Sequence, residues 1–249
     1  QLMPAQVIQS NTTPFQSITV DPVTLDIIEN ALRNARSEMD AVLFRTAMSP
    51  GIREQHDAFP MIANHEGKMV VGQFGSFFWG FQQGYDGTIE EGDVFLTNDP
   101  YSCNGAVSHL NDWLMMMPIY IDGRLVAWAA MFGHMTDIGG KVPGSLPTDA
   151  AQVFEEGIQV PPVKIIRNGE LNTEILELIL RNCRLPDWNR SDFNALVAAL
   201  RLAERRVLEM ANRFGVDELV VAMVEMLDRN KRAMGAILNM VIPEKKQHF

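Results

Sequence analysis

Cysteine is scarce in this chain: Cys103 and Cys183 are the only two, and they form no Cys-x-x-Cys pair. The sequence therefore indicates neither a disulfide framework nor a cysteine-based zinc site. Such usage is typical of a reducing cytoplasm, which is the location that we expect. Cys103 stands close to a polar cluster without an adjacent base. We interpret it as a packing residue, with nucleophile or ligand as the alternative.

Long apolar runs and an excess of basic residues are also missing. No stretch approaches the roughly 20 apolar residues that a membrane helix needs, and the sequence does not begin with the basic-then-apolar pattern of a secretory signal. The formal charge is -10, and nothing resembles a basic stripe that would neutralise phosphates. We therefore expect neither a membrane nor a nucleic acid as a partner.

The two common nucleotide-binding motifs are absent as well. Neither GxxxxGK[ST] nor GxGxxG occurs, so this chain by itself has no recognisable ATP site. What is present is an ordinary globular composition, with 47% hydrophobic and 21% charged residues. The length of 249 residues suits one large domain or two modest ones.

Signals for a long helix follow an expected extended arm over residues 1–20. Asp21-Pro22 provides an N-cap and a proline at the first helical position. The pattern predicts an amphipathic helix to about Met48, because Pro50 then interrupts it. Its apolar residues recur at spacings of three and four: Leu25, Ile28, Leu32, Ala35, Met39 and Val42.

The last third of the chain has the pattern of helices alone. We predict helices over residues 172–184, 191–214 and 217–241, the second closed by Gly215 and the third by Pro243. Their apolar faces exceed what the β-structure can cover, so we expect this helical region, residues 171–249, to pack on further chain or on a partner subunit.

The fold class that we predict is α+β. A mixed αβ catalytic domain over residues 21–170 combines the long N-terminal helix with antiparallel β-hairpins, and the all-helical C-terminal third follows it. A hairpin is expected around Gly67, a short strand over residues 94–97, and a strand over residues 158–166 that Pro161-Pro162 interrupts.

The polar residues of most chemical interest gather around another predicted hairpin. Its strands cover residues 114–121 and 125–132, and Asp122-Gly123 between them tolerates the positive φ angles of a tight turn. Asp112 and His134 flank the strands at the end away from the turn, so the hairpin brings them within side-chain reach. His109 joins them from three residues upstream.

Two interpretations of this polar cluster remain open. Imidazole nitrogens and a carboxylate form a ligand set that suits Zn, Mn or Fe and leaves positions for water or substrate. Alternatively, the histidines cap strand ends by bonding to backbone carbonyls, while the aspartates serve turns.

Three further segments carry alternatives of their own. The polar group at residues 53–57 either lines a site or forms a surface loop. The aromatic stretch at residues 74–85 either walls a pocket or packs in the core. The glycine-rich residues 139–145 either hold an anion with backbone amides or form a plain turn.

The order of the motifs resembles the hydantoinase B/oxoprolinase family over nearly the whole chain. The helix at DPVTLDIIENAL and the RTAMSPGIRE segment are similar too, although this chain reads GAVSHLND where hydantoinase-type members usually read GGTHLPD. Chains of that family are longer, so we expect a portion of a subunit or a split version. The similar motifs are NDPY (98–101), SHLND (108–112), GHMTDIGG (133–140), PGS (143–145) and EEGIQVPP (155–162).

The resemblance implies a subunit of a hetero-oligomer whose hydantoinase A-type partner binds ATP and Mg. Similar motifs in an acetone carboxylase subunit hold Mn, so the implied ligands of a Mn or Zn ion are His109, Asp112 and His134. Asp137 is then expected to orient an imidazole or act as a base, and Asn111 is assigned a catalytic role beside it.

The family contains several reactions, and the residues alone do not choose among them. Our first prediction is ATP-dependent hydrolysis of a cyclic amide such as a hydantoin, oxoproline or a lactam. The alternative is ATP-dependent carboxylation of a ketone, as in acetone and acetophenone carboxylase, toward which the SHLND departure points. A third possibility, of another class, is a non-catalytic assembly subunit.

Overall fold

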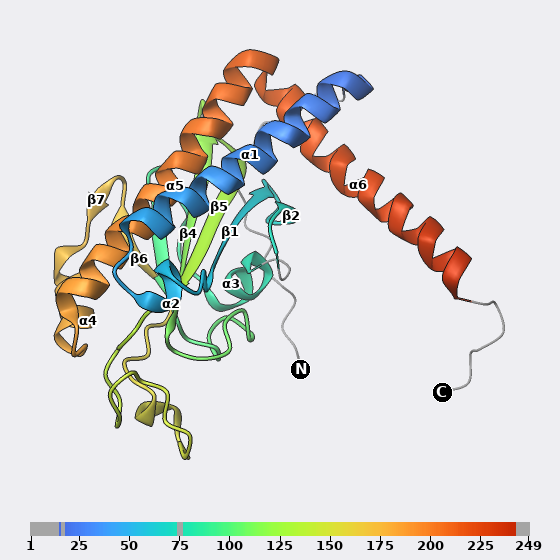
Figure 1. The fold of residues 1–249 in the computed structure, drawn as a ribbon. Coiled ribbons are helices and arrows are strands. Elements are labelled where there is room, and N and C mark those ends of the chain that lie inside the picture. The colour runs from blue at the N-terminus through green and yellow to red at the C-terminus, as the bar shows by residue number, and fades with distance from the viewer. Residues whose placement is uncertain (1–14, 16–17, 74–76, 243–249) are drawn as a thin grey trace.

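A seven-stranded antiparallel sheet forms the centre of the computed structural model (Figure 1). The structure describes residues 15, 18–73 and 77–242, so most of the expected N-terminal arm and Pro243 lie outside the described residues. The strand order is β2-β1-β5-β4-β3-β6-β7. The strands are β1 (Ala58–Asn64), β2 (Met69–Val71), β3 (Val94–Thr97), β4 (Asp112–Ile121), β5 (Arg124–His134), β6 (Val163–Arg167) and β7 (Glu170–Leu171).

Two long helices, α1 and α5, run side by side over one face of this sheet (Figure 1). The α1 prediction is confirmed: the Asp21 carboxylate accepts hydrogen bonds from the Val23 and Thr24 amides, and the helix ends at Thr46. The helices are α1 (Pro22–Thr46), α2 (Pro50–Arg53), α3 (Phe78–Gly84), α4 (Thr173–Arg181), α5 (Pro186–Phe214) and α6 (Val216–Val241), with a 3-10 turn η1 (Val153–Glu155).

The predicted start of α5 at Ser191 is wrong. The helix begins at Pro186, which takes a first-turn position where its missing amide hydrogen costs nothing. The end of α4 also differs, at Arg181 instead of 184. Gly215 does separate α5 from α6, at φ 97°.

Both predicted hairpins are confirmed. Strands β4 and β5 pair along their whole length, with Asp122 and Gly123 at φ 51° and 71° in the turn. Strands β1 and β2 pair around Gly67, whose φ is 79°. The strand predicted over residues 158–166 is shorter, because β6 begins only after the two prolines, which cannot donate to a ladder.

The sheet separates two apolar clusters, since side chains alternate between its faces along β4. Trp113 and Met115 pack on the side of α1 and α5, whereas Leu114 and Met116 pack on the side of α3. Three residues of the aromatic stretch, Phe77, Phe78 and Phe81, are buried in the second cluster, which favours core packing for them. Trp79 is 62% exposed, and Phe74 lies outside the described residues.

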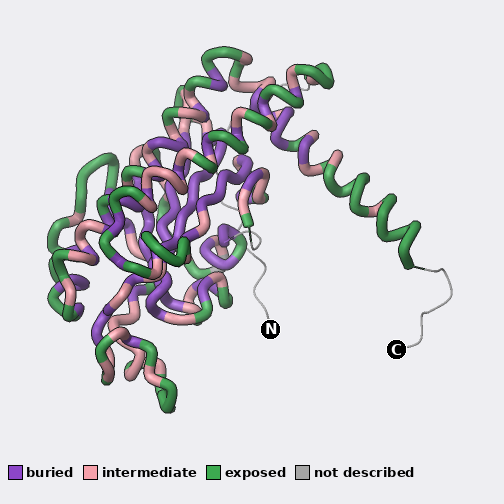
Figure 2. The backbone as a smooth tube through the Cα atoms, in the orientation of Figure 1, coloured by how far each residue is buried: buried purple, intermediate pink, exposed green. Residues whose placement is uncertain are grey.

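The inner and outer parts of α6 have different environments. The inner turns join the core through Leu219, Val220 and Met223. The outer turns extend away from the body, where Met234 and Ile237 are 57% and 56% exposed (Figures 1 and 2).

Within the described ranges, no helix has the length and apolarity to cross a bilayer. The predicted α+β class, with its long first helix, antiparallel sheet and C-terminal helices, is confirmed.

Candidate metal centre

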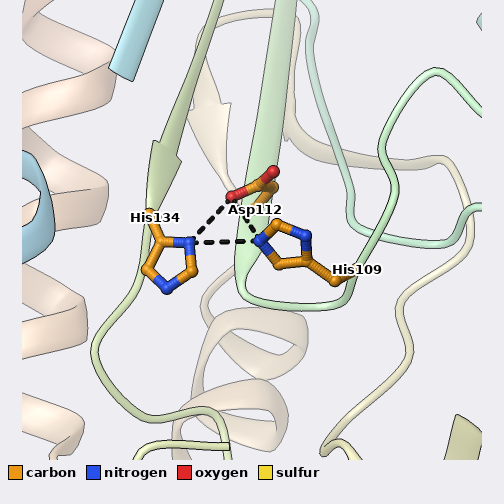
Figure 3. A group of neighbouring side chains, drawn as sticks. All are labelled: His109, Asp112 and His134. Carbon is orange, nitrogen blue, oxygen red and sulfur yellow. Dashed lines mark hydrogen bonds and ion pairs between the residues drawn. The ribbon is translucent and has the colours of Figure 1, made fainter. Parts of the chain in front are cut away.

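Three polar side chains meet at the open end of the β4–β5 hairpin (Figure 3). His109 Nε2 lies 3.2 Å from His134 Nδ1 and 3.2 Å from Asp112 Oδ1, and His134 Nδ1 lies 3.1 Å from the same carboxylate oxygen. The three side chains are partly buried, with 34%, 17% and 12% exposed for His109, His134 and Asp112. The structure therefore brings together all three residues that the sequence pairs in space.

Hydrogen bonding alone cannot satisfy this triangle of atoms. Each imidazole nitrogen carries at most one hydrogen and an ionised carboxylate carries none, so at most two of the three contacts are hydrogen bonds. A cation removes the conflict, because all three atoms can then present lone pairs to it.

The spacing of the three donor atoms also fits one divalent ion. Ligand atoms bound about 2.0 to 2.2 Å from an ion, at tetrahedral or octahedral angles, lie roughly 2.8 to 3.6 Å apart. The edges of 3.1 to 3.2 Å fall inside that range. Two imidazoles and a carboxylate are donors that Zn and Mn accept, so the residues fit the ion that the sequence implies.

The backbone ladder places two of these candidate ligands. Asp112 and His134 are register partners at the first residue of β4 and the last of β5, so neither depends on a flexible loop. The His134 amide also donates to the Asp57 carbonyl, which ties the end of β5 to the residue that precedes β1.

His109 comes instead from the loop between β3 and β4, and Asn98 braces that loop. The buried Asn98 amide group donates to the carbonyls of Leu110, at 2.7 Å, and Ile158, at 2.9 Å. Its oxygen accepts from the Val160 amide at 2.7 Å. Ser108 Oγ lies 3.1 Å from His109 Nδ1, which leaves Nε2 facing the cluster.

Interactions within the cluster favour the charged forms of His109 and Asp112. Hydrogen bonding to Asp112 raises the pKa of His109, against the opposing effect of burial. Burial would raise the pKa of Asp112, but hydrogen bonds from His109 and His134 outweigh it and hold that pKa below its usual range. The carboxylate is therefore ionised at neutral pH, as a ligand must be.

Asp57 stands at the rim of the cluster. Its Oδ2 lies 3.6 Å from His134 Nδ1, and its side chain is 43% exposed. The sequence predicts only a polar group at residues 53–57, without connecting it to the histidines. The signal is the position of Asp57 just before a strand, but only the pairing of β1 with β5 reveals its neighbour.

Asn111 and Asp137 lie apart from this group of donor atoms. The side chain of Asn111 is buried, and its Nδ2 donates to the carbonyls of Met135 and Gly144. The carboxylate of Asp137 accepts from the amides of Gly139 and Gly144 and pairs with Arg184 at 3.1 Å. Within the described part of the chain, neither imidazole of the cluster is a hydrogen-bond partner of Asp137.

The glycine-rich loop therefore has an internal carboxylate in place of a bound anion. The amides of Gly139 and Gly144 are occupied by Asp137, and Arg184 donates to the carbonyls of Gly139, Gly140 and Val142. These contacts favour the interpretation of a structural turn.

Cys103 is buried, and its thiol donates to the Asp99 carbonyl at 2.7 Å. Burial raises the pKa of this thiol, which favours its unreactive form. Both observations agree with the predicted packing role.

A comparison with known protein families shows to which family this chain belongs. The model that describes hydantoinase B/oxoprolinase matches residues 21–249. The chain belongs to the hydantoinase B/oxoprolinase family.

Two similar proteins illustrate the range of enzymes that contain such chains. Caprolactamase subunit beta of Pseudomonas jessenii is 35% identical over 229 residues, which cover 88% of this chain and 39% of that subunit. Acetophenone carboxylase delta subunit of Aromatoleum aromaticum is 29% identical over 171 residues, which cover 65% and 25%.

Solved structures agree with this membership. The crystal structure of the ATP-dependent caprolactamase from Pseudomonas jessenii superimposes with a TM-score of 0.81 at 33% identity, over 89% of this chain and 39% of that one. Nucleotide-free acetone carboxylase gives a TM-score of 0.73 at 20% identity, over 82% and 28%, which is a likeness of fold. This chain thus spans 39% of the length of the caprolactamase subunit.

Proposed function

We propose that this chain forms the metal-bearing part of a hydantoinase B-type subunit in an ATP-dependent enzyme that hydrolyses a cyclic amide. The convergence of His109, Asp112 and His134 on one point is the observation that carries the proposal. The 35% identity to a caprolactamase subunit favours a lactam-like substrate over other carbonyl compounds.

The metal would be held by His109 Nε2, Asp112 Oδ1 and His134 Nδ1, with Mn or Zn as the candidates. A divalent ion bound there would act as a Lewis acid toward the oxygen of a carbonyl or of a phosphorylated substrate. Three protein ligands would leave at least one coordination position for water or substrate, which a catalytic site requires and a structural site lacks.

Asp57 is the residue that we propose for a fourth ligand or for proton transfer. Its exposed carboxylate lies within a small side-chain rotation of the cluster, since Oδ2 is already 3.6 Å from His134 Nδ1. A carboxylate in this place can also orient an attacking water by accepting a hydrogen bond.

Asn111 and Asp137, which the sequence assigns to catalysis, are proposed to support the site indirectly. Asn111 holds the Met135 carbonyl, next to His134, while Asp137 holds the following loop in shape. Both side chains are buried and bond to backbone groups. We therefore propose that they hold the surrounding backbone in place and do not react themselves.

The proposal includes an ATP-binding partner of the hydantoinase A type and a cytoplasmic complex. The sequence has neither of the two phosphate-binding glycine motifs, and the caprolactamase whose structure resembles this chain is ATP-dependent. The exposed outer turns of α6 support our prediction that the helical region packs on further chain or on a partner subunit.

Ketone carboxylation is the second candidate. It is favoured by the 29% identity to an acetophenone carboxylase subunit and by SHLND in the ligand loop. An assembly subunit without metal is the third, and its sign would be a purified complex that contains no stoichiometric transition metal.

One assay separates these candidates. The complex with its partner is supplied with ATP and either a lactam, a hydantoin, or a ketone with bicarbonate, and ADP release is measured. Cyclic-amide-dependent ADP release, lost in His134→Ala, supports the proposal. Release that requires ketone and bicarbonate supports carboxylation, and the absence of stimulation by every substrate, with no bound metal, supports the assembly role.

A further inference from the structure

A buried carboxylate on α5 reaches the segment that lies behind His134. Asp192 is fully buried, and its Oδ1 lies 2.5 Å from the Met48 amide. The Ser49 amide donates to the same carboxylate, at 3.2 Å from Oδ2. In the described part of the chain, no basic side chain forms an ion pair with Asp192, so the carboxylate is held by backbone amides that precede α2.

Ser49 continues this connection toward the ligand strand. Its side chain is fully buried, and its Oγ accepts from the Thr136 amide at 3.1 Å. Thr136 follows His134 by two residues, so Ser49 links α5 to the backbone that leaves β5. In this connection the Thr136 amide donates to the Ser49 hydroxyl, and the Ser49 amide donates to Asp192.

The short helix α2 packs directly on the ligand. A Cβ at Gly51 would stand 3.4 Å from His134 Cδ2, so the α2 backbone lies in contact with the imidazole. Ile52 is fully buried and lies against Gly133 at the end of β5. A shift of α2 would therefore move or release the His134 ring.

We propose that Asp192 is a positioning residue for His134, acting through Ser49 and α2. A buried carboxylate without a cation is costly, and the two backbone amides of Met48 and Ser49 that donate to Asp192 offset that cost at one specific segment. The role rests on the proposed function, because what it positions is the metal ligand. Groups that hydrogen-bond directly to a metal ligand change metal affinity about 10- to 100-fold when they are replaced, and we expect an effect of that order from Asp192.

The matched control is another buried carboxylate that also holds backbone. Asp93 accepts from the amides of Glu90 and Asn168 and pairs with Lys164, at the end of β3 away from the ligand loop. Asp192→Asn replaces one acceptor oxygen by an NH₂ group. This donor would face the amide of Ser49 or Met48, which is also a donor, so one hydrogen bond would be lost. Ser49→Ala removes only the acceptor for Thr136 and decides the matter if Asp192→Asn fails to fold.

Mn²⁺ alone is titrated into each metal-free protein, and free Mn²⁺ is followed by electron paramagnetic resonance. We expect Asp192→Asn and Ser49→Ala to raise the Kd about 10- to 100-fold, whereas Asp93→Asn keeps the wild-type Kd even with a lower unfolding midpoint. A wild-type Kd in Asp192→Asn and Ser49→Ala overturns the proposal.

Imidazole NMR signals of the metal-free protein distinguish this proposal from the proposed function. If the wild type binds no Mn²⁺, the proposed function fails, and the His134 signals then judge the positioning role alone. Signals that shift or broaden in Asp192→Asn but not in Asp93→Asn support it. Unchanged His134 signals in Asp192→Asn overturn it.

Discussion

His134 lies directly opposite Asp112 in the β4–β5 ladder, and its Nδ1 is 3.1 Å from the Asp112 carboxylate. Backbone hydrogen bonds along two long strands hold this pair, whereas His109 arrives from a loop. Two of the candidate ligands thus lie on paired strands, and the third lies on a loop that Asn98 braces. The three donor atoms already stand 3.1 to 3.2 Å apart, so the candidate centre is preformed.

Loss of one rigid ligand tests the centre most directly. We expect His134→Ala to lose its stoichiometric metal, because two donor atoms remain of three and the loss exceeds the roughly 10- to 100-fold effect of a supporting residue. Metal content of the purified protein, measured by mass spectrometry, checks this. His65→Ala, in the β1–β2 turn, is the control. Equal metal in His134→Ala and wild type would contradict the site.

Asp57 is predicted to contribute from the rim. Asp57→Ala should weaken Mn²⁺ or Zn²⁺ binding about tenfold, since its carboxylate lies 3.6 Å from His134 Nδ1. Titration calorimetry with each ion measures the change. Glu54→Gln removes a negative charge from the same exposed segment and should bind as wild type. An equal loss in both variants would mean that only net charge matters.

Asp137 is predicted to make the glycine-rich loop sensitive to acid. Burial opposes ionisation, but amides of Gly144 and Gly139 together with Arg184 hold the pKa of Asp137 below its usual range. Because the folded pKa lies below the unfolded one, near 3.9, this stabilisation is present above about pH 4 and is lost as pH falls through the folded pKa.

The measurement is urea unfolding of wild type and Asp137→Asn between pH 7 and pH 3. We expect the variant to be less stable by about 2 kcal/mol at pH 7, with the difference shrinking toward pH 3. Asp86→Asn, at an exposed aspartate, should follow the wild type at every pH. A difference that stays constant with pH would show that the charge of Asp137 is not what stabilises the loop.

The outer turns of α6 are predicted to mediate association. Met234, Ile237, Leu238 and Val241 recur at spacings of three and four, and each is at least 46% exposed. Ile237→Glu should therefore reduce association with the partner, or self-association of the purified chain, in sedimentation velocity. Asn239→Glu, on another side of the helix, is the control. A wild-type chain that is monomeric, compact and fully soluble alone would refute this prediction.

Local signals account for the elements that the sequence predicts correctly. Asp21-Pro22 starts α1, and Asp122-Gly123 closes the central hairpin, because cap and turn chemistry depends on adjacent residues only. The predicted start of α5 at Ser191 is too late, because Pro186 occupies the first turn of the helix.

The ligand cluster was accessible from sequence for a related reason. A hairpin register converts positions along the chain into positions in space, so the sequence alone pairs Asp112 with His134. No hairpin register relates Asp137 to its partner Arg184, because Arg184 comes from the connection between α4 and α5.

By itself, the sequence determined the hairpin, the long helices and the meeting of two histidines with an aspartate, because periodicity and turn chemistry act over short stretches of chain. Only the tertiary structure decided that Asp57 joins the rim of the cluster and that Asp192 reaches the segment behind His134. Those contacts depend on how β1 pairs with β5 and how α5 packs over the sheet, and packing between distant segments leaves no local pattern to read.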